Sequence, residues 1–236
     1  MRTLIYVPII HTAADLGSMA RDIDKKGISS LGEEIWAKHR QTVDGFWDAI
    51  SDYFDSLDVR GMKIYQDGMI GDGEVGERIV QDTAKAGSKN YQLVSRLLER
   101  GAVLAKTEEF KLVKQEYDSL LAIIQAKSTI RKIAAFIRYK LVKNRLLNKR
   151  DAFIAKRIDQ TLKPDEQGIL FIGALHKIKK RLAKSIKLKE IKDTDKARQY
   201  QKLLPFHNKY QERFGKLGKY LISPVPHDIS DCTGSA

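Results

Sequence analysis

Two histidines, His11 and His176, directly follow apolar stretches whose composition is typical of buried strands. Asp67 follows a third such stretch, and Glu108 follows a fourth. In a parallel sheet the carboxyl ends of the strands lie along one edge, and ligands bind outside that edge. We therefore expect these four side chains, which are far apart in the chain, to meet at one edge of a sheet.

Side chains of these types at one site predict a hydrolytic centre. Two imidazoles with one or two carboxylates suit zinc, manganese or iron with open coordination positions, and such a metal would activate water. Without a metal, a histidine paired with a carboxylate is a general base. His11, His176, Asp67 and Glu108 are therefore candidate ligands of a divalent metal, and His176 and Asp67 are candidate catalytic residues. Asp67, which precedes Gly68, and Glu108, which opens a helical pattern, also fit purely structural roles.

The strands that would position these side chains alternate with helices along the chain. Strands are expected at residues 3–10, 59–65, 102–105 and 169–172, with an edge strand at 186–191. Such alternation predicts an α/β fold with a mainly parallel sheet and helices on both faces. Residues 1–10 resemble a signal peptide only superficially, because their short apolar run is rich in β-branched residues and fits a buried strand better.

A long helical insertion is expected between the third and fourth strands. Residues 108–162 contain neither proline nor glycine, which predicts two or three long helices, broken near residues 127–129 and near Asn148. Residues 12–28 are rich in Gly, Ser and Asp and are expected to be irregular. Apolar residues at spacings of three and four then predict an amphipathic helix of about 28 residues, with His39 on its apolar face.

Length and composition predict one globular domain. The chain has 236 residues, of which 42% are hydrophobic and 31% charged, values that supply a sizeable core. We expect a single α/β domain over residues 1–222 and a loose tail over residues 223–236. His207 and His227, near the end of the chain, are expected at the surface. Cys232 is the only cysteine, so a cysteine-based zinc cluster and an internal disulfide are both excluded.

The positive charge is concentrated in the second half of the chain. The net charge is +13, and most of the excess lies in residues 121–236, above all between Lys127 and Lys192. This asymmetry indicates either a solvated helix face or a surface for nucleic acid or an acidic protein. No apolar run approaches the roughly 20 residues of a membrane span. We expect a soluble, cytoplasmic protein that has the capacity to form oligomers.

Two stretches together resemble the TraB/TIKI superfamily, which includes ChaN-like and erythromycin-esterase-like branches. In residues 149–182 a helix is followed by an apolar strand and by Gly173-Ala-Leu-His176. The family has a helix that opens with an acidic-Arg-Asn triplet, then a strand ending in Gly-x-x-His. Arg150 and His176 match this pattern, whereas Lys149 and Asp151 depart from the outer positions of the triplet.

The second stretch is Tyr6-Val-Pro8-Ile-Ile-His11, where the family usually has another Gly-x-x-His and this chain has Pro8 in place of the glycine. Asp67 stands where the family has a strand ending in glutamate, and the neighbouring Gln66 is an equally good match for that position. The order of these elements covers almost the whole predicted domain.

The resemblance implies a polar site at the strand ends. It does not imply one reaction, because the branches of the superfamily differ in their chemistry. TIKI-type members look like metal-dependent proteases, esterase-type members use histidine as a base without metal, and ChaN-like members bind haem. Our leading hypothesis is a hydrolase in which Arg150 binds an anionic substrate group or stabilises developing negative charge. The rival hypothesis is a non-catalytic protein whose basic half binds nucleic acid or an acidic partner. A third is a scaffold that packs through residues 108–162.

Overall fold

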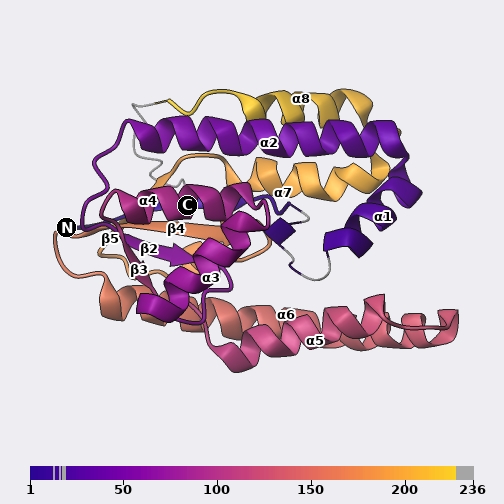
Figure 1. The fold of residues 1–236 in the computed structure, drawn as a ribbon, viewed down its shortest axis with the longest axis horizontal. Coiled ribbons are helices and arrows are strands. Elements are labelled where there is room, and N and C mark those ends of the chain that lie inside the picture. Colours follow the sequence, from indigo (N-terminus) through magenta and orange to yellow (C-terminus); the bar gives the residue numbers. More distant parts are fainter. Residues whose placement is uncertain (13, 16, 18–19, 227–236) are drawn as a thin grey trace.

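The sheet is built from apolar strands that alternate their side chains between two cores. The structure, a computed structural model, describes residues 1–12, 14–15, 17 and 20–226. Within these residues it contains a five-stranded sheet, parallel throughout, in the order β3-β2-β4-β1-β5 (Figure 1). The strands are β1 (Arg2–Ile9), β2 (Lys63–Gln66), β3 (Val103–Ala105), β4 (Gln167–Gly173) and β5 (Ile186–Glu190). This architecture confirms the predicted α/β fold.

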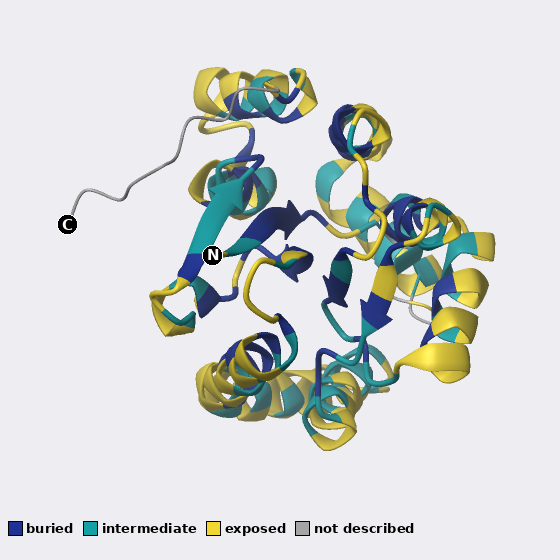
Figure 2. Cartoon of the chain, turned by 90° about the vertical axis from the view of Figure 1, so that its left-hand side faces the viewer, coloured by how far each residue is buried: buried dark blue, intermediate teal, exposed yellow. Residues whose placement is uncertain are grey.

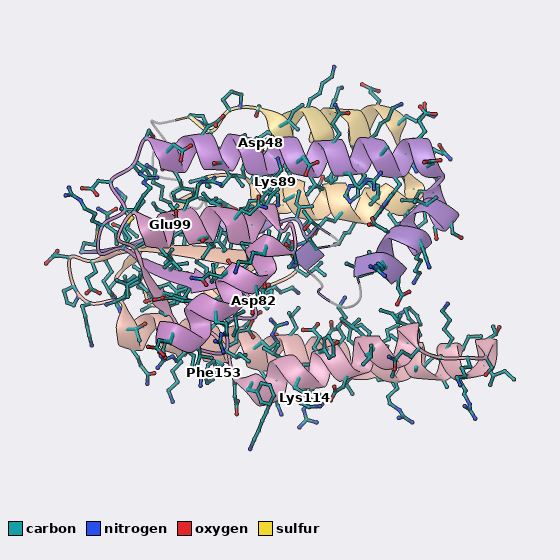
Figure 3. All side chains as sticks on the ribbon, viewed as in Figure 1. Asp48, Asp82, Lys89, Glu99, Lys114 and Phe153 are labelled. Carbon is teal, nitrogen blue, oxygen red and sulfur yellow. The ribbon has the colours of Figure 1, made fainter. Side chains whose placement is uncertain are left out.

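Helices cover both faces of the sheet, as predicted (Figure 2). Because successive strand residues point to opposite faces, Ile5 and Val7 of β1 join the larger core while Leu4 and Tyr6 join the smaller one. The larger core is completed by five helices, namely α2 (Glu33–Asp55), α3 (Gly73–Lys85), α4 (Lys89–Glu99), α7 (Thr194–Leu203) and α8 (Gln211–Ile222). On this side Lys89 of α4 forms an ion pair with Asp48 of α2 at 2.7 Å (Figure 3).

The predicted insertion is a helical hairpin made of α5 (Phe110–Ile124) and α6 (Thr129–Thr161). The two helices pack side by side and extend past the rest of the molecule (Figure 1). The C-terminal half of α6, together with the 3₁₀ turn η2 (Ile178–Arg181), packs on the other face of the sheet and completes the smaller core. The predicted break at residues 127–129 is confirmed. The predicted break near Asn148 is wrong, because Leu146, Ile154 and Ile158 give α6 one buried face across that position.

The prediction that residues 12–28 are irregular is wrong for their second half, where Ala20–Leu31 form α1. This helix buries no side chain, so it lacks the apolar stripe that reveals a helix in a sequence. It is held by Trp36, whose Nε1 donates to Asp24 Oδ1 at 2.9 Å. The Trp36 ring lies so close to Gly27 that a Cβ there would be 2.5 Å from it. Gly32, with φ of 83°, separates α1 from α2, so α2 has 23 residues, fewer than the predicted length.

Two histidine predictions have different outcomes. His39 is buried on the apolar face of α2, as predicted, and its Nδ1 lies 3.1 Å from Tyr200 Oη. His207 is also buried, which contradicts the prediction of a surface position. It follows the short 3₁₀ turn η3 (Leu204–Phe206), and its ring packs 6.4 Å from that of Phe214. His227 lies outside the described residues.

The core extends slightly beyond the predicted domain boundary at residue 222. Val225 is buried and belongs to the larger core, so the segment 223–226 is attached to the domain. Residues 227–236, the remainder of the predicted tail, and Cys232 with them, lie outside the described residues. In the part of the chain that the structure describes, no helix is both long and apolar enough to cross a bilayer.

Substitution of Phe171, in the central strand β4, tests the assignment of the larger core. Its side chain is fully buried, with ring centroids 5.9 Å from Phe54 and 6.5 Å from Trp47. Phe171→Ala should lower the free energy of unfolding by about 3–5 kcal/mol, because it leaves a cavity between the sheet and α2. Urea denaturation followed by circular dichroism measures the change. The matched control is Phe206→Ala, since Phe206 is exposed, and a comparable loss in both variants would contradict the assignment of the core.

Candidate functional site

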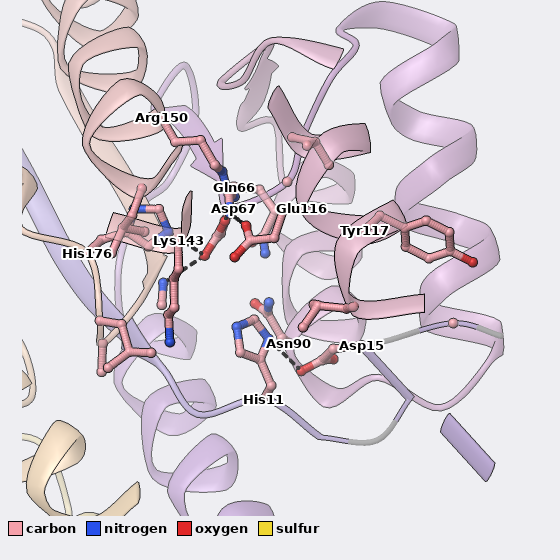
Figure 4. A pocket seen from close by; sticks show the side chains of 18 of the residues that line it. His11, Asp15, Gln66, Asp67, Asn90, Glu116, Tyr117, Lys143, Arg150 and His176 are labelled. Carbon is pink, nitrogen blue, oxygen red and sulfur yellow. Dashed lines mark hydrogen bonds and ion pairs between the residues drawn. The ribbon is translucent and has the colours of Figure 1, made fainter. Parts of the chain in front are cut away.

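A cavity of about 650 Å³ lies at the carboxyl-terminal edge of the sheet, beside the α5–α6 hairpin. Its floor comes from the ends of three adjacent strands: His11 follows β1, Asp67 follows β2, Gly173 ends β4, and His176 lies in the turn after β4. Its wall comes from the inner side of the hairpin, including Leu147 of α6. The strand order therefore brings together residues that are more than a hundred positions apart (Figure 4).

His176 is held by a turn and by a carboxylate. The chain turns after β4, where the His176 amide donates to the Gly173 carbonyl at 3.0 Å. The Nδ1 of the buried imidazole lies 2.5 Å from Oδ1 of Asp151, and Asp151 Oδ2 accepts the Lys177 amide at 2.9 Å. Because a carboxylate accepts, the proton on Nδ1 points to Asp151, and Nε2 is the nitrogen that faces Asp67. That nitrogen lies 3.5 Å from Oδ2 of Asp67.

Asp67 joins two strand ends. Its Oδ2 accepts the Gly173 amide at 2.9 Å, and its Oδ1 pairs with Nη2 of Arg150 at 2.6 Å. A Cβ at position 173 would lie 3.0 Å from Oδ2 of Asp67 and 3.5 Å from both Nε2 of His11 and Cδ2 of His176. The side chains of His11, Asp67 and His176 thus converge on the space that the missing side chain of Gly173 leaves free.

Arg150 is buried among three carboxylates. In addition to Asp67, its guanidinium donates to both oxygens of Glu108, with Nε at 2.5 Å from Oε2, and to Oε2 of Glu116 on α5. Glu108 is fully buried, and its Oε1 also accepts the Gly68 amide at 2.9 Å. A guanidinium has five donors in a planar fork, and Arg150 uses them to tie α6 to the sheet edge and to α5.

The charges in this cluster shift one another's pKa values. Burial raises the pKa of Asp67, but the opposite charges of His176 and Arg150 outweigh it and lower that pKa below its ordinary range. Burial raises the pKa of Glu108, and the nearby Asp67 raises it further, against the effect of Arg150. For His176, burial lowers the pKa, but Asp67 and Asp151 raise it more, so the net pKa lies above 6.5.

His11 forms a second arrangement of histidine and carboxylate across the cavity from His176. Its Nδ1 lies 3.5 Å from Oδ2 of the buried Asp15, and 40% of its side chain is exposed. Asp15 also accepts the Thr12 amide at 2.8 Å and the hydroxyl of Ser88. Loss of solvent around His11 lowers its pKa, but Asp15 raises it more. Both histidines therefore direct Nδ1 to an aspartate and leave Nε2 for a ligand.

Two buried amide side chains in the cavity wall have unused hydrogen-bonding atoms. Among the residues that the structure describes, neither Oδ1 nor Nδ2 of Asn90 has a hydrogen-bond partner, and the same holds for Oε1 of Gln66. Both residues are almost fully buried and line the cavity. Buried polar atoms are normally paired, so these two amides are suited to bind a polar group of a ligand.

The structure brings all five sequence-predicted site residues to one edge, but in two layers. His11, Asp67, Arg150 and His176 line the cavity, whereas Glu108 lies behind them and contacts Arg150. In the described residues no group of three or more His, Cys, Asp or Glu side chains is arranged to hold a metal ion. Both carboxylates that were predicted as ligands accept hydrogen bonds from Arg150.

Sequence reasoning assigned no role to three groups that hold the predicted residues, namely Asp15, Glu116 and Asp151, or to the unpaired amide of Asn90. Gln66 entered only as an alternative match for a position of the family. A signal was available for Asp151, because it stands four residues before Ala155 and seven before Ile158, on the buried face of α6. No comparable signal exists for Asn90, a polar residue in the first turn of α4.

Comparison of the chain with protein-family models, with curated proteins and with solved structures found no match. The resemblance to the TraB/TIKI superfamily therefore stays a prediction, and the site is interpreted from its own geometry.

Arg150→Ala tests the buried charge cluster. Removal of the guanidinium leaves Asp67 and Glu108 buried without their partner, which should cost about 3–5 kcal/mol of unfolding free energy at pH 7. Because the folded-state pKa of Asp67 is depressed, its pairing stabilises the fold above its ordinary pKa of 3.8 and is lost as the pH falls. The deficit of the variant should therefore shrink in acid. Urea denaturation at pH 7 and at acidic pH measures this loss of unfolding free energy. The control is Arg145→Ala, since Arg145 is an exposed residue of the same helix. Equal effects of the two substitutions would refute the interpretation.

Proposed function

We propose that this chain is a hydrolase in which His176, oriented by Asp151, transfers the proton between water and a substrate bound in the cavity. The observation that carries the proposal is the line of three buried groups: Asp151 lies 2.5 Å from Nδ1 of His176, and Asp67 lies 3.5 Å from Nε2. The cavity of about 650 Å³ beside them is large enough for a small-molecule ligand.

His176 serves as a base in its neutral form and as an acid in its protonated form. The Asp151 carboxylate fixes the proton on Nδ1, so that Nε2 is the atom available for proton transfer. Asp67 and Asp151 raise the pKa of His176 above 6.5. The basic form therefore becomes populated at a higher pH than for a free histidine.

Arg150 acts as a positioning residue in this proposal. Three carboxylates occupy its guanidinium, so it orients Asp67 and leaves substrate contacts to other groups. The unpaired atoms, both of the Asn90 amide and Oε1 of Gln66, supply a donor and acceptors for a carbonyl or N–H group. The hairpin wall adds apolar side chains such as Leu147. The combination suits an ester or amide with an apolar substituent.

A divalent metal, zinc, manganese or iron, is the alternative to metal-free proton transfer. Histidines that bind metals usually donate their other ring nitrogen to a carboxylate, and His11 and His176 each face an aspartate through Nδ1. Asp67, however, would have to exchange its contacts with Arg150 and the Gly173 amide for the metal. The metal-free version keeps those contacts, and for that reason we favour it.

Hydrolysis of a panel of p-nitrophenyl esters and peptidyl p-nitroanilides tests the proposal. The wild-type chain should turn over at least one of them, and His176→Ala should lower kcat/KM by about 10²–10⁴-fold, the usual effect of losing a general base. His207→Ala is the matched control, because His207 is buried away from the cavity. Equal activity of wild type and His176→Ala would overturn the proposal, as would the absence of turnover across the panel.

Asp151→Asn tests the orientation of His176 through the pH profile. Loss of the carboxylate removes one of the charges that raise the pKa of His176, so the rising limb of kcat/KM against pH should move to lower pH while kcat falls. Imidazole titration by NMR gives the same pKa independently of activity. An unchanged titration of His176 would show that Asp151 has no electrostatic role.

Elemental analysis of untagged protein decides between the two versions. The metal-free version predicts no stoichiometric metal and activity that survives dialysis against a chelator. The metal-dependent version would be correct instead if the protein contains near-stoichiometric zinc, manganese or iron and the His11→Ala/His176→Ala double variant loses that metal.

A further inference from the structure

The outer face of α6 carries a stripe of exposed apolar side chains. Ile130 is 81% exposed, Ile133 54%, Ile137 52% and Leu141 79%. Their spacings of three, four and four place them on one side of the helix. Large apolar side chains gathered on one exposed face are typical of a binding surface; we call these four residues the apolar stripe.

The apolar stripe is on the side of α6 that faces away from α5. The inner side contributes Tyr139, whose hydroxyl donates to Glu116 of α5 at 3.2 Å, and the buried Leu146. At 100° per residue these two positions lie roughly opposite to Ile137 and Leu141. The hairpin also extends past the rest of the fold, and its side chains point into the surroundings along its length (Figures 1 and 3). The four side chains of the apolar stripe are therefore open to a partner.

Basic side chains flank the apolar stripe. Residues 127–149 contain eight Lys and Arg and no Asp or Glu. On the helix, Lys140 lies on one side of the stripe, and Arg138 and Arg145 lie on the other, all three of them exposed. Long basic side chains extend their charged ends away from an apolar surface while their methylene groups stay on it.

We infer that this face of the hairpin binds the surface of an anionic lipid membrane, with α6 lying in the plane of the headgroups. An apolar stripe with basic residues on both sides is the pattern of helices that lie in the membrane interface, and anionic headgroups attract such basic residues. The helix lies on the bilayer without crossing it, in agreement with the absence of a membrane-spanning helix among the described residues.

The charge and the apolar character of this surface favour an anionic membrane over a second copy of the hairpin and over a nucleic acid. A second copy of this surface would bring basic residues against basic residues, because residues 127–149 contain no Asp or Glu, and the like charges would repel. A nucleic acid would neutralise the basic residues but would leave Ile137 and Leu141 in water. An anionic membrane satisfies both parts of the surface. This inference uses the outer face of the hairpin and is independent of the hydrolase proposal, which uses its inner face.

Vesicle flotation of the full-length protein tests the inference. Wild-type protein should float with vesicles of phosphatidylcholine and phosphatidylserine, and about tenfold less with phosphatidylcholine alone. Ile137→Ser/Leu141→Ser should reduce binding to the mixed vesicles by about tenfold or more, since it removes apolar contact with the bilayer. Its matched control is Val75→Ser/Phe206→Ser, which removes two exposed apolar side chains elsewhere. Circular dichroism confirms that each variant is folded.

The basic residues are tested separately. Arg138→Gln/Lys140→Gln should weaken binding to the mixed vesicles and reduce its salt dependence, whereas Arg78→Gln/Lys85→Gln on α3 should leave both unchanged. Absence of flotation, or flotation that is insensitive to Ile137→Ser/Leu141→Ser, overturns the inference. A dimer abolished by that variant, without vesicle binding, identifies a second copy as the partner instead. Salt-sensitive binding to RNA or DNA that the variant retains, again without vesicle binding, identifies a nucleic acid.

Discussion

The guanidinium of Arg150 is the interaction on which the arrangement of the site depends. A buried charge is tolerated only when it is paired, and Arg150 finds its partners in Asp67 at the end of β2, Glu108 before α5, and Glu116 on α5. These contacts fix the rotation of α6 against the sheet edge. Asp151, the next residue along the helix, then faces the end of β4 and binds His176. Two consecutive residues of one helix thus organise the ends of two neighbouring strands.

Because of the α5–α6 hairpin, the cavity has one polar side and one apolar side. The sheet edge supplies ionised and polar groups that are held by short hydrogen bonds, and the inner side of the hairpin supplies apolar side chains. Arg150 connects the two sides, because its guanidinium contacts both Glu116 of α5 and Asp67 at the end of β2. A movement of the hairpin would change these contacts, so the shape of the cavity and the orientation of Asp67 are physically linked through Arg150.

The sheet and the edge at which the polar residues meet were predictable from the sequence, because both follow from local patterns. Apolar runs predict the strands, and the carboxyl ends of parallel strands share an edge, which brings together His11, Asp67 and His176. Their partners were less predictable. Helical periodicity places Asp151 on the buried face of α6, but its contact with His176 depends on tertiary packing. Asp15 is buried behind His11 only because of tertiary packing, and no local pattern separates it from surface aspartates. The same limit applies to α1, whose position depends on one tryptophan from the next helix.

The position of β4 in the sheet has a consequence for the order in which the fold can assemble. β1 pairs with β4 and β5, and β2 pairs with β3 and β4, so β4 is the strand that joins the two halves of the sheet. It is also the fourth strand to leave the ribosome. Until residues 167–173 have been synthesised, β1 has no neighbouring strand, and its apolar side chains lack one side of their packing. The chain must therefore keep its first strand from aggregating during most of translation, and contacts of such long sequence separation form slowly.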